Sequence, residues 1–588
     1  MSVLDLYLAQ AQSYWRTYLA GETIDGPPIL VDMMHSNLEY VAAGLSVAAS
    51  VRTATKRPLV GLIGRAGQLD ATTPPSDVAA IYYLGEAYGV ERYIDMHHET
   101  QAMPPAGAWL DPLRRIAGLG TDGARMAPDI IDAVKRFKDP DGFPLGRFVM
   151  DTTLRATLTP HLRHGADYAY WVEYLGRARD WAARLFADMP VTAVTVGHSD
   201  YCPHGFLAEF GLSRGTPALL WTASDRSAFL VNRLEPEQTF IGACRQANAT
   251  AFVAHEADAA AWGSAGEVQA LARLVLAGDI QIARTGLAGD ISAADGRILD
   301  VRAELFDNDP RPIVCLFAHT YSDVPCQDDA LYRDHQDWLE QTLIAAASDQ
   351  SYNLLIKVHP LDLSYDVSGL TAALEAAFGD HANIAFWRGP IENAVLARDC
   401  ALGVTVRGTP GFLLPTLGLR MVLAGRSVFS DVGVAETPET PEAYLERLRT
   451  VGDTPAMSDD EIALARRFLV FHLLTGSRRK ANVPILRSNG RDSPFFAHAG
   501  ELLKTWIPEE CEIARDLARL WSPDDGFRGP AGLRIGGRIP APEPEPEPNL
   551  DHEPGSPPVD VPPRRRGPGS WFRIGPFAGL DRTEREIF

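Results

Sequence analysis

Short apolar runs alternate with amphipathic stretches in the first part of the chain. Residues 29–34 and 59–63 are apolar runs of strand length, and a further strand is expected at residues 92–96. Residues 36–45 and 76–89 lie between them and carry apolar side chains at helical spacing. Strands that alternate with helices of this length predict a parallel sheet with right-handed crossovers.

The same alternation returns farther along the chain. Two doubly wound, Rossmann-like domains that face each other across a cleft would explain it, and this α/β fold binds ligands at the carboxyl ends of its strands. The remaining strand-like runs are at residues 191–196, 217–221, 313–317, 352–358, 384–387 and 400–406, and the helix-like stretches are at 205–212, 338–346, 370–378 and 412–417.

The end of the chain has a different composition. Residues 540–563 contain the runs PAPEPEPEP and PGSPPVDVPP, and such a Pro/Glu tract has almost nothing to bury. We expect an extended linker and a disordered tail, with a short docking peptide at SWFR, residues 570–573, as the alternative. The predicted division is a first domain at residues 1–300, a second at 301–537, and a linker and tail at 538–588.

Composition and charge exclude several classes of protein. Of the 588 residues, 46% are hydrophobic and 22% charged, as is usual for globular proteins. The formal net charge of −21 opposes a general nucleic-acid surface and wholesale adsorption to anionic lipid, because both need basic residues. There is no apolar run of membrane-spanning length, and the amino-terminal stretch carries Asp5 rather than a signal-peptide core. These features predict a cytoplasmic protein that binds no nucleic acid.

The cysteines support the same compartment. The six cysteines are scattered and form no CxxC pair. Cys315, for example, lies within the apolar run at residues 313–317. This usage predicts reduced thiols in a cytosolic protein rather than a disulfide or zinc framework.

The segment IKVHP at residues 356–360 carries the sharpest candidate chemistry. A strand delivers Lys357 and His359 to the same side, and Pro360 ends the strand. Both side chains would arrive at the carboxyl end of the strand, where a doubly wound fold binds ligand. An ammonium and an imidazole suit a phosphate, the first as a point charge and the second as a hydrogen-bond donor. A histidine that only satisfies its own loop is the alternative.

A glycine-rich turn, TVRGTPG at residues 405–411, follows a predicted strand and precedes an apolar helix. Glycines such as Gly408 and Gly411 let the backbone approach a ligand closely. The helix that follows would offer free N–H groups and a positive dipole end to an anion. A tight turn without a ligand is the alternative.

With their surroundings, these two motifs resemble the capsule polysaccharide biosynthesis family of bacterial glycosyltransferases. The resemblance covers residues 312–450, and two stretches of the first half, GFPLGRFVMDTTLR and VGHSDYCPHGFLAEFGLSRGTPALLW, add to it. Leu413 or its neighbour departs from the family, where many relatives carry a glutamate, and Gly418-Leu419-Arg420-Met421 replaces the usual Gly-Lys-Pro. The matching segments are VCLFAHTYSDV, LYRDHQDWL, LLIKVHPLD, VTVRGTPGFLLPTLGLRMVLAG and YLERL.

The resemblance implies the GT-B fold, with an acceptor-side first domain and a nucleotide-donor second domain. It also implies sugar transfer without a bound metal or other cofactor, because helix dipoles and basic side chains stabilise the leaving nucleotide. The residues implied in substrate binding are Asp323, Lys357, His359, Pro360, Arg407, Gly408, Thr409 and Gly411.

Transfer of this kind needs a base that deprotonates the acceptor hydroxyl. The first domain should supply it, and the candidates are Asp200 and His198, just after a predicted strand, and Asp151. His35, at another strand end, is a further alternative. A capping or loop hydrogen bond is the competing interpretation for each of them, and His204 is expected to cap the helix that follows it.

Two DxD-like pairs raise the question of a metal. Asp139 and Asp141 form one pair, and Asp307 and Asp309 form the other. Both lie among Pro, Gly and Asn residues, so turn chemistry explains them. No metal site is expected.

The sequence is therefore interpreted as a glycosyltransferase that moves a sugar, or a related polyol phosphate, from a nucleotide-sugar donor to a surface or capsular polysaccharide or lipid-linked glycan. Peripheral association with an export complex at the inner membrane is a further hypothesis. One alternative is a nucleotide-sugar 2-epimerase of the same fold. The other is a non-catalytic polysaccharide-assembly protein with a decayed donor site, which the absent glutamate keeps open.

We expect a chain that ends at Gly537 to melt at the same temperature as the full chain. The reason is that the tract at residues 540–563 has almost no apolar side chains to bury. Differential scanning calorimetry of both proteins makes the comparison. A clear loss of stability in the shorter chain would mean that the tail packs on the body.

Overall fold

The structure is a computed structural model, and its residues divide by contacts into the units Met1–Arg538 and Ile539–Phe588. All described residues belong to the first unit, so the predicted linker and tail at residues 538–588 lie outside them. The described residues are 2–35, 37–64, 77–221, 228–257, 298, 300–325, 330–362, 366–477, 490–504, 521–522, 526–527 and 533–535.

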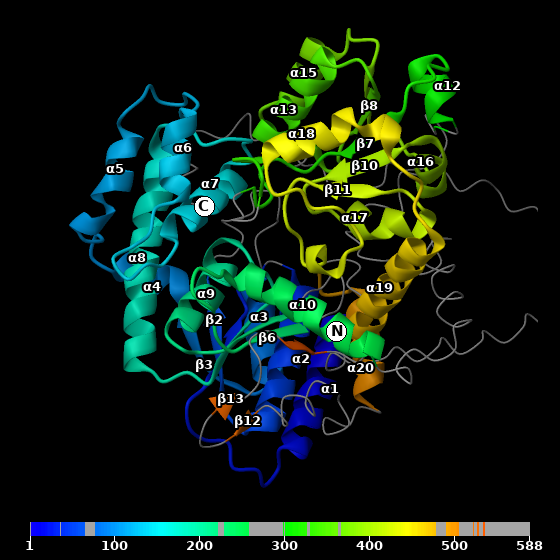
Figure 1. Ribbon diagram of the computed structural model, residues 1–588. Helices are drawn as coiled ribbons and strands as arrows, with labels where there is room; N and C mark the ends of the chain where they lie inside the picture. Colours follow the sequence, from blue (N-terminus) through cyan, green and yellow to red (C-terminus); the bar gives the residue numbers. More distant parts are fainter. Residues whose placement is uncertain are drawn as a thin grey trace, which may run out of the picture. The chain divides into compact units, whose positions relative to one another are not determined.

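A seven-stranded sheet forms the first half, and its labelled strands β2, β3 and β6 can be followed in Figure 1. The strand order is β14-β6-β5-β4-β1-β2-β3. Five strands, β1 to β5, are parallel, and β6 and β14 run antiparallel to their neighbours. From β3 to β6 this is the doubly wound order 3-2-1-4-5-6, with its switch point between β1 and β4. The strands are β1 (Ile29–Asp32), β2 (Leu59–Ile63), β3 (Val90–Asp95), β4 (Ala193–Val196), β5 (Ala218–Trp221), β6 (Ala228–Val231) and β14 (Leu533–Ile535).

Helices bury both faces of this sheet, which is why its central strands are continuous apolar runs. Leu30 faces one apolar cluster and Val31 the other, because successive side chains of a strand alternate. Helices α1 (Val3–Tyr18), α2 (Leu38–Thr55), α3 (Val78–Ala87) and α20 (Pro494–Leu503) contribute to the Val31 side, and α4 (Met96–Ala102), α5 (Asp111–Ala117), α6 (Pro128–Lys135), α7 (Leu145–Thr157), α8 (Ala166–Asp188), α9 (Phe206–Ser213) and α10 (Phe240–Ala257) contribute to the Leu30 side.

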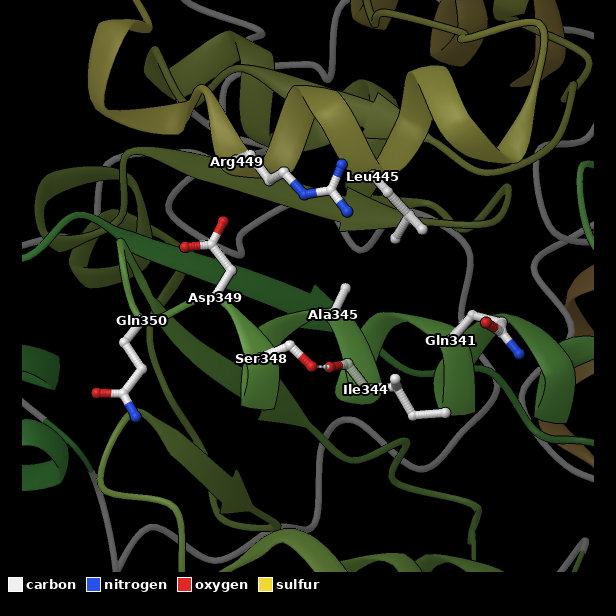
Figure 2. A pocket seen from close by; sticks show the side chains of 8 residues that line it. All are labelled: Gln341, Ile344, Ala345, Ser348, Asp349, Gln350, Leu445 and Arg449. Carbon is white, nitrogen blue, oxygen red and sulfur yellow. Dashed lines mark hydrogen bonds between the residues drawn. The ribbon is translucent and has the colours of Figure 1, made fainter.

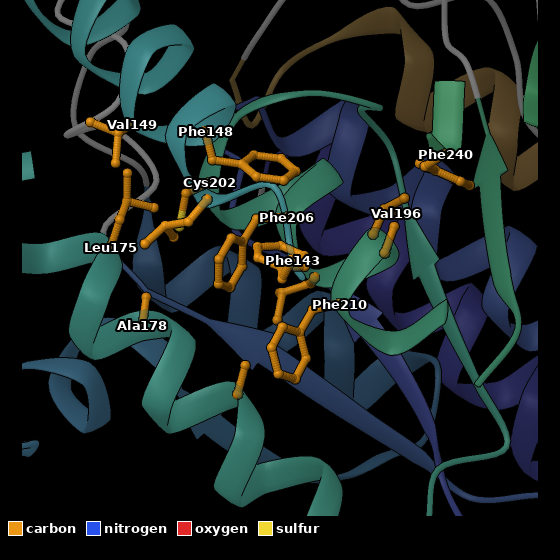
Figure 3. Close-up of a cluster of buried hydrophobic side chains, with 14 of the residues drawn as sticks. Phe143, Phe148, Val149, Leu175, Ala178, Val196, Cys202, Phe206, Phe210 and Phe240 are labelled. Carbon is orange, nitrogen blue, oxygen red and sulfur yellow. The ribbon is translucent and has the colours of Figure 1, made fainter. Parts of the chain in front are cut away.

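Several phenylalanine rings lie in the Leu30 side of the core, as Figure 3 shows. The Phe143 ring lies 5.5 Å from that of Phe148 and 5.3 Å from that of Phe206, in stacked and edge-on arrangements. These contacts join α7 to α9, the helix that follows β4. The loop between β4 and α9 is therefore held against a rigid base.

A five-stranded parallel sheet forms the second half, in the order β11-β10-β7-β8-β9. One face of this sheet packs on α13, α15 and α18, and the other packs on α12 and α16. On the first face, the Trp338 indole N–H of α13 donates to the Tyr444 hydroxyl of α18 at 3.0 Å. The elements are β7 (Ile313–Phe317), β8 (Asn353–Lys357), β9 (Ile384–Trp387), β10 (Leu402–Thr405), β11 (Met421–Leu423), α12 (Val301–Phe306), α13 (His335–Ser348), α15 (Leu370–Phe378), α16 (Asn393–Asp399), α17 (Pro410–Leu413), α18 (Pro441–Arg449) and α19 (Asp459–Ser477).

Two doubly wound sheets, one parallel and one mainly parallel, confirm the predicted α/β fold class. The predicted domain boundary between residues 300 and 301 stays a proposal. After α19 the chain returns to the first sheet. Helix α20 packs on α1, and β14 pairs with β6 with Leu533 opposite Leu230. Residues 494–503 and 533–535 thus lie with the first half, although the predicted division placed them in the second.

Replacing Phe496 by Ala should lower the free energy of unfolding by about 3–5 kcal/mol, the usual cost of emptying a buried aromatic site. Phe496 is fully buried on α20, and its ring lies 5.5 Å from that of Tyr7 on α1. Urea unfolding measures the change, and His498→Ala, on the exposed side of α20, is the control. A loss below 1 kcal/mol for Phe496→Ala would show that α20 contributes little to the first half.

Candidate functional site

The carboxyl ends of β7 and β10 form the centre of the candidate site. The chain leads from β7 to β8 and β9 on one side and to β10 and β11 on the other, so the switch point falls between β7 and β10. Doubly wound sheets bind ligands in the crevice at this point. His319 follows β7 and Arg407 follows β10.

His319 connects the two strand ends and was missed by the sequence analysis. Its Nε2 lies 3.1 Å from the Thr405 hydroxyl, and the Arg407 backbone N–H donates to the same nitrogen at 3.4 Å. Burial lowers the pKa of His319 well below its ordinary value, with the charge of Arg407 among the further causes. The ring is therefore neutral at pH 7, and because Nε2 accepts, its proton lies on Nδ1.

Arg407 places a guanidinium at this centre. Its Nη2 is buried and makes no hydrogen bond to any residue that the structure describes. Burial lowers the pKa of Arg407, and the carboxylates of Asp200, Asp151 and Asp323 act in the opposite direction. An arginine remains protonated under such conditions, so a cation with an unused N–H donor lies at the carboxyl edge of the second sheet.

Lys357 ends β8, and it is half-buried. Its register partners are Phe317 on β7 and Trp387 on β9, so its backbone lies at the same edge of the sheet as His319. Burial lowers the pKa of the ammonium. Because a buried ammonium gains from any nearby anion, Lys357 is suited to hold a phosphate at this edge.

His359 lies two residues beyond Lys357, with Pro360 exposed behind it. Its Nδ1 accepts the backbone N–H of Leu361 at 3.1 Å. Burial lowers the pKa of His359, Asp323 opposes this effect, and Lys357 adds to it. The neutral ring therefore carries its proton on Nε2, so its outward nitrogen is a hydrogen-bond donor.

The glycine-rich turn differs from the predicted phosphate cradle. The expected helix at residues 412–417 is a four-residue α17 followed by a 3₁₀ turn, Leu414–Leu417, so it presents only a short dipole. A Cβ on Gly411 would lie 2.8 Å from Leu423 and 2.9 Å from Phe429, which shows that this glycine permits core packing. Gly408 lies beside the Thr405 hydroxyl, and Thr409 is exposed. Gly411 is thus explained by packing rather than by ligand approach.

Asp323 connects the two halves of the described chain. Its carboxylate accepts the Tyr201 hydroxyl at 2.7 Å and lies 3.9 Å from Arg155, both in the first half. Burial raises the pKa of Asp323, but Arg155 and the hydrogen bond from Tyr201 outweigh it, and the pKa is lowered. Tyr201 and Val324 both have left-handed backbones, with φ of 59° and 51°. Such strain is concentrated at functional sites.

His198 and Asp200 follow β4 at the switch point of the first sheet. The Asp200 backbone N–H donates to His198 Nδ1 at 3.2 Å, and the Asp200 carboxylate accepts the Ser199 hydroxyl at 2.5 Å. Burial lowers the pKa of His198, and Asp200 and Asp323 oppose this effect. His198 thus lies in the electrostatic field of Asp323, and Asp200 in that of Arg407.

Asp151 lies on α7 and is only 2% exposed. Its charge raises the pKa of Arg407 and that of Tyr201, which places it near both. A carboxylate this deeply buried is suited to balance the charge of Arg407 rather than to meet an acceptor.

The sequence also gave no indication of a contact between His204 and Asp32 in the first half. His204 Nδ1 lies 2.5 Å from the Asp32 carboxylate, whose other oxygen accepts the Met34 backbone N–H at 3.0 Å. Asp32 ends β1, and His204 lies between β4 and α9. The two residues are 172 positions apart in the chain, so no local motif reveals the pair. His204 thus contacts a carboxylate, although it was expected to cap a helix.

Three of the four aspartates in the DxD-like pairs contact arginines. Asp139 and Asp141 both contact Arg179, at 2.6 and 2.5 Å, and Asp309 contacts Arg311. Within the described residues, no group of three or more His, Cys, Asp or Glu side chains is arranged to hold a metal ion.

A pocket lies away from these residues, between α13 and α18 (Figure 2). Gln341, Ser348 and Asp349 line it from α13 and its end, and Leu445 and Arg449 from α18. None of the candidate site residues lines it. In the part of the chain that is described, no helix is long and apolar enough to cross a membrane.

No protein-family model and no curated protein sequence matches the chain. Among solved structures, it is similar to Thermosulfurimonas dismutans KpsC, a beta Kdo 2,4 transferase, with 13% identity, a TM-score of 0.30, and coverage of 49% of this chain and 85% of that one. It is also similar to Anabaena Alr3699/HepE in complex with UDP, with 8% identity, a TM-score of 0.25, and coverage of 76% of this chain and 94% of that one. A third similar structure is a Listeria monocytogenes protein described as a UDP-N-acetylglucosamine 2-epimerase. Its identity is 8% and its TM-score 0.24, and the match covers 82% of this chain and 96% of that one. TM-scores of this size carry no argument about family or activity.

Replacing Tyr201 by Phe removes the hydroxyl that donates to Asp323 and keeps the buried ring. We expect the free energy of unfolding at pH 7 to fall by about 0.5–1.5 kcal/mol. Because the folded pKa of Asp323 is lowered, this contribution is present at neutral pH and is lost as the pH falls below 3.8 through the lowered value.

Guanidinium unfolding of the wild type and of Tyr201→Phe, at pH 7 and at a pH below 3.8, measures the difference in the free energy of unfolding. Tyr83→Phe, a change at a half-exposed tyrosine of α3, serves as the matched control. A difference that stays constant with pH would show that the hydroxyl does not stabilise the Asp323 carboxylate.

Proposed function

We propose that the protein transfers a sugar, or a related polyol phosphate, from a nucleotide-activated donor to a surface or capsular polysaccharide or lipid-linked glycan. One observation carries the proposal: Arg407 places a cation with a buried, unused N–H at the switch point of the second sheet. Lys357 ends β8, the strand on the other side of β7, and His359 lies two residues beyond it. Two cations and an N–H donor at one sheet edge match the charge and hydrogen-bond needs of a diphosphate or phosphodiester.

The state of His359 supports its role toward a phosphate. The Leu361 backbone N–H occupies Nδ1, so the neutral ring presents an N–H from Nε2. Such a donor can bind phosphate oxygens without being protonated first. The lowered pKa of His359 means that this donor is present throughout the neutral range.

The same groups account for departure of the nucleotide. When the bond from the sugar to the phosphate breaks, negative charge develops on the phosphate oxygen. Preorganised cations and N–H donors at that position stabilise the charge. Lys357, Arg407 and His359 supply them without a metal ion, so we propose a metal-independent reaction.

The first half supplies the groups for the acceptor. Asp200, His198 and Asp151 lie close enough to Arg407 or Asp323 to affect their pKa, and Tyr201 bonds to Asp323 directly. A base from the first half would take the proton of the acceptor hydroxyl.

Nucleotide binding tests the proposal. Thermal-shift measurements with CMP, UDP, GDP and CDP in excess EDTA should show stabilisation by one of them, because a ligand that binds only the folded state raises its melting temperature. Lys357→Ala and His359→Ala should each weaken that binding by about 1.5–3 kcal/mol, or roughly tenfold to a hundredfold.

Lys504→Ala and His498→Ala are the matched controls, because both residues are exposed on or beside α20. Binding of no nucleotide by the folded wild type would favour the non-catalytic assembly protein. Nucleotide release that needs no acceptor and yields an epimerised sugar would favour the 2-epimerase. Binding that requires Mg²⁺ or Mn²⁺ would overturn the metal-independent mechanism.

A further inference from the structure

Three histidines lie at the switch point between β1 and β4 of the first sheet. His35 follows β1, and His198 and His204 follow β4. The His204 ring is 6.2 Å from that of His35 and 6.0 Å from that of His198. Whether each ring can accept a proton depends on what its Nδ1 contacts, because the two nitrogens of a neutral imidazole have opposite roles.

Two of the three accept a backbone N–H at Nδ1. His35 Nδ1 accepts the Asn37 backbone N–H at 3.0 Å, and His198 Nδ1 accepts the Asp200 backbone N–H at 3.2 Å. In the neutral ring the proton then lies on Nε2. Such a ring donates a hydrogen bond from its outward nitrogen and has no lone pair there with which to take a proton.

His204 has the opposite arrangement. Its Nδ1 lies 2.5 Å from Asp32, and this carboxylate is further fixed by the Met34 backbone N–H. Burial raises the pKa of Asp32, but the interactions with His204 and Met34 outweigh it, and the pKa is lowered. The carboxylate is ionised, so in the neutral ring His204 donates from Nδ1 and its lone pair lies on Nε2. Among the described residues, none hydrogen-bonds to Nε2.

We propose that His204 is the general base of the transfer and that Asp32 is its positioning residue; this inference rests on the proposed function. The acceptor hydroxyl gives its proton to His204 Nε2 as its oxygen bonds to the anomeric carbon of the donor. The bond from that carbon to the phosphate breaks, and the nucleotide leaves with the electron pair. A single displacement of this kind inverts the anomeric configuration.

The surrounding charges favour this proton transfer. The imidazolium that forms faces the Asp32 carboxylate, and Asp200 lies beside His198 on the same loop. Burial keeps His198 neutral, so it adds no opposing charge there. The thiol of Cys202, near Asp32, also stays neutral because burial raises its pKa. The His35 ring stacks on that of Tyr40, with 4.1 Å between the ring centroids.

His204→Asn separates this role from a structural one. The asparagine amide can keep an N–H at the position of Nδ1 for Asp32 but has no counterpart of Nε2. We expect unchanged folding and nucleotide binding, and a fall in turnover of about 10²–10⁴-fold, the usual contribution of a general base. His498→Asn, the same change at an exposed site on α20, should leave turnover unaltered.

Turnover can be measured without the natural acceptor. The probe is hydrolysis of sugars linked to the nucleotide that gives the largest thermal shift, with water in the acceptor's place. In Asp32→Asn kcat should fall while KM stays unchanged, because the imidazolium that forms in the transition state loses the carboxylate that faces it. NMR of the released sugar should show the inverted anomer.

Several results would overturn the assignment. Turnover of His204→Asn within threefold of wild type would leave the pair a structural contact. Loss in His198→Asn with activity retained in His204→Asn would make His198 the base. A product of retained configuration would exclude direct displacement. A wild type that binds no nucleotide would overturn the proposed function itself, and the base assignment with it.

Discussion

The parallel pairing of β7 with β10, in which Val314 lies opposite Leu402, is the constraint on which the candidate donor site depends. It places the ends of two strands, separated in the chain by β8 and β9, next to each other. His319 and Arg407 can then share a hydrogen bond, although they are 88 residues apart. A register slip of one residue would turn the alternating side chains of β10 to the opposite face and move Arg407 away from His319. Apolar residues on both faces oppose such a slip, because each face of the sheet belongs to its own buried cluster.

At the carboxyl edge of the second sheet, burial disfavours the charged forms of Arg407, Asp323 and Lys357. The three groups differ in which neighbouring charges offset this effect. Arg407 is balanced by carboxylates from both halves, and Asp323 by Arg155 and Tyr201. The pKa of Lys357 is lowered by burial with no carboxylate among its causes. Lys357 is half-buried, so an incoming anion would offset part of its desolvation.

The sequence predicted the strands well because a parallel sheet covered on both faces needs continuous apolar runs. It also predicted that the residues after these runs would gather, since parallel strands end at one edge. It could not predict the strand order, and therefore not the partners of His319. Gly411 was assigned to ligand approach, whereas the side chains it makes room for, Leu423 and Phe429, come from later elements. The return of α20 and β14 to the first half has no local signal either.

The histidines show why a motif alone cannot assign a role. His359 and His198 each follow a strand, and each accepts a backbone N–H from two residues ahead, so loop geometry alone makes them donors. His204 differs because a distant strand end provides a carboxylate in place of the backbone N–H. The loop that holds His204 is anchored by the Cys202 N–H, which donates to Thr152 of α7, and by the aromatic core beneath α9. The capacity of this imidazole to accept a proton is therefore set by packing between β1, α7 and α9 rather than by its own segment.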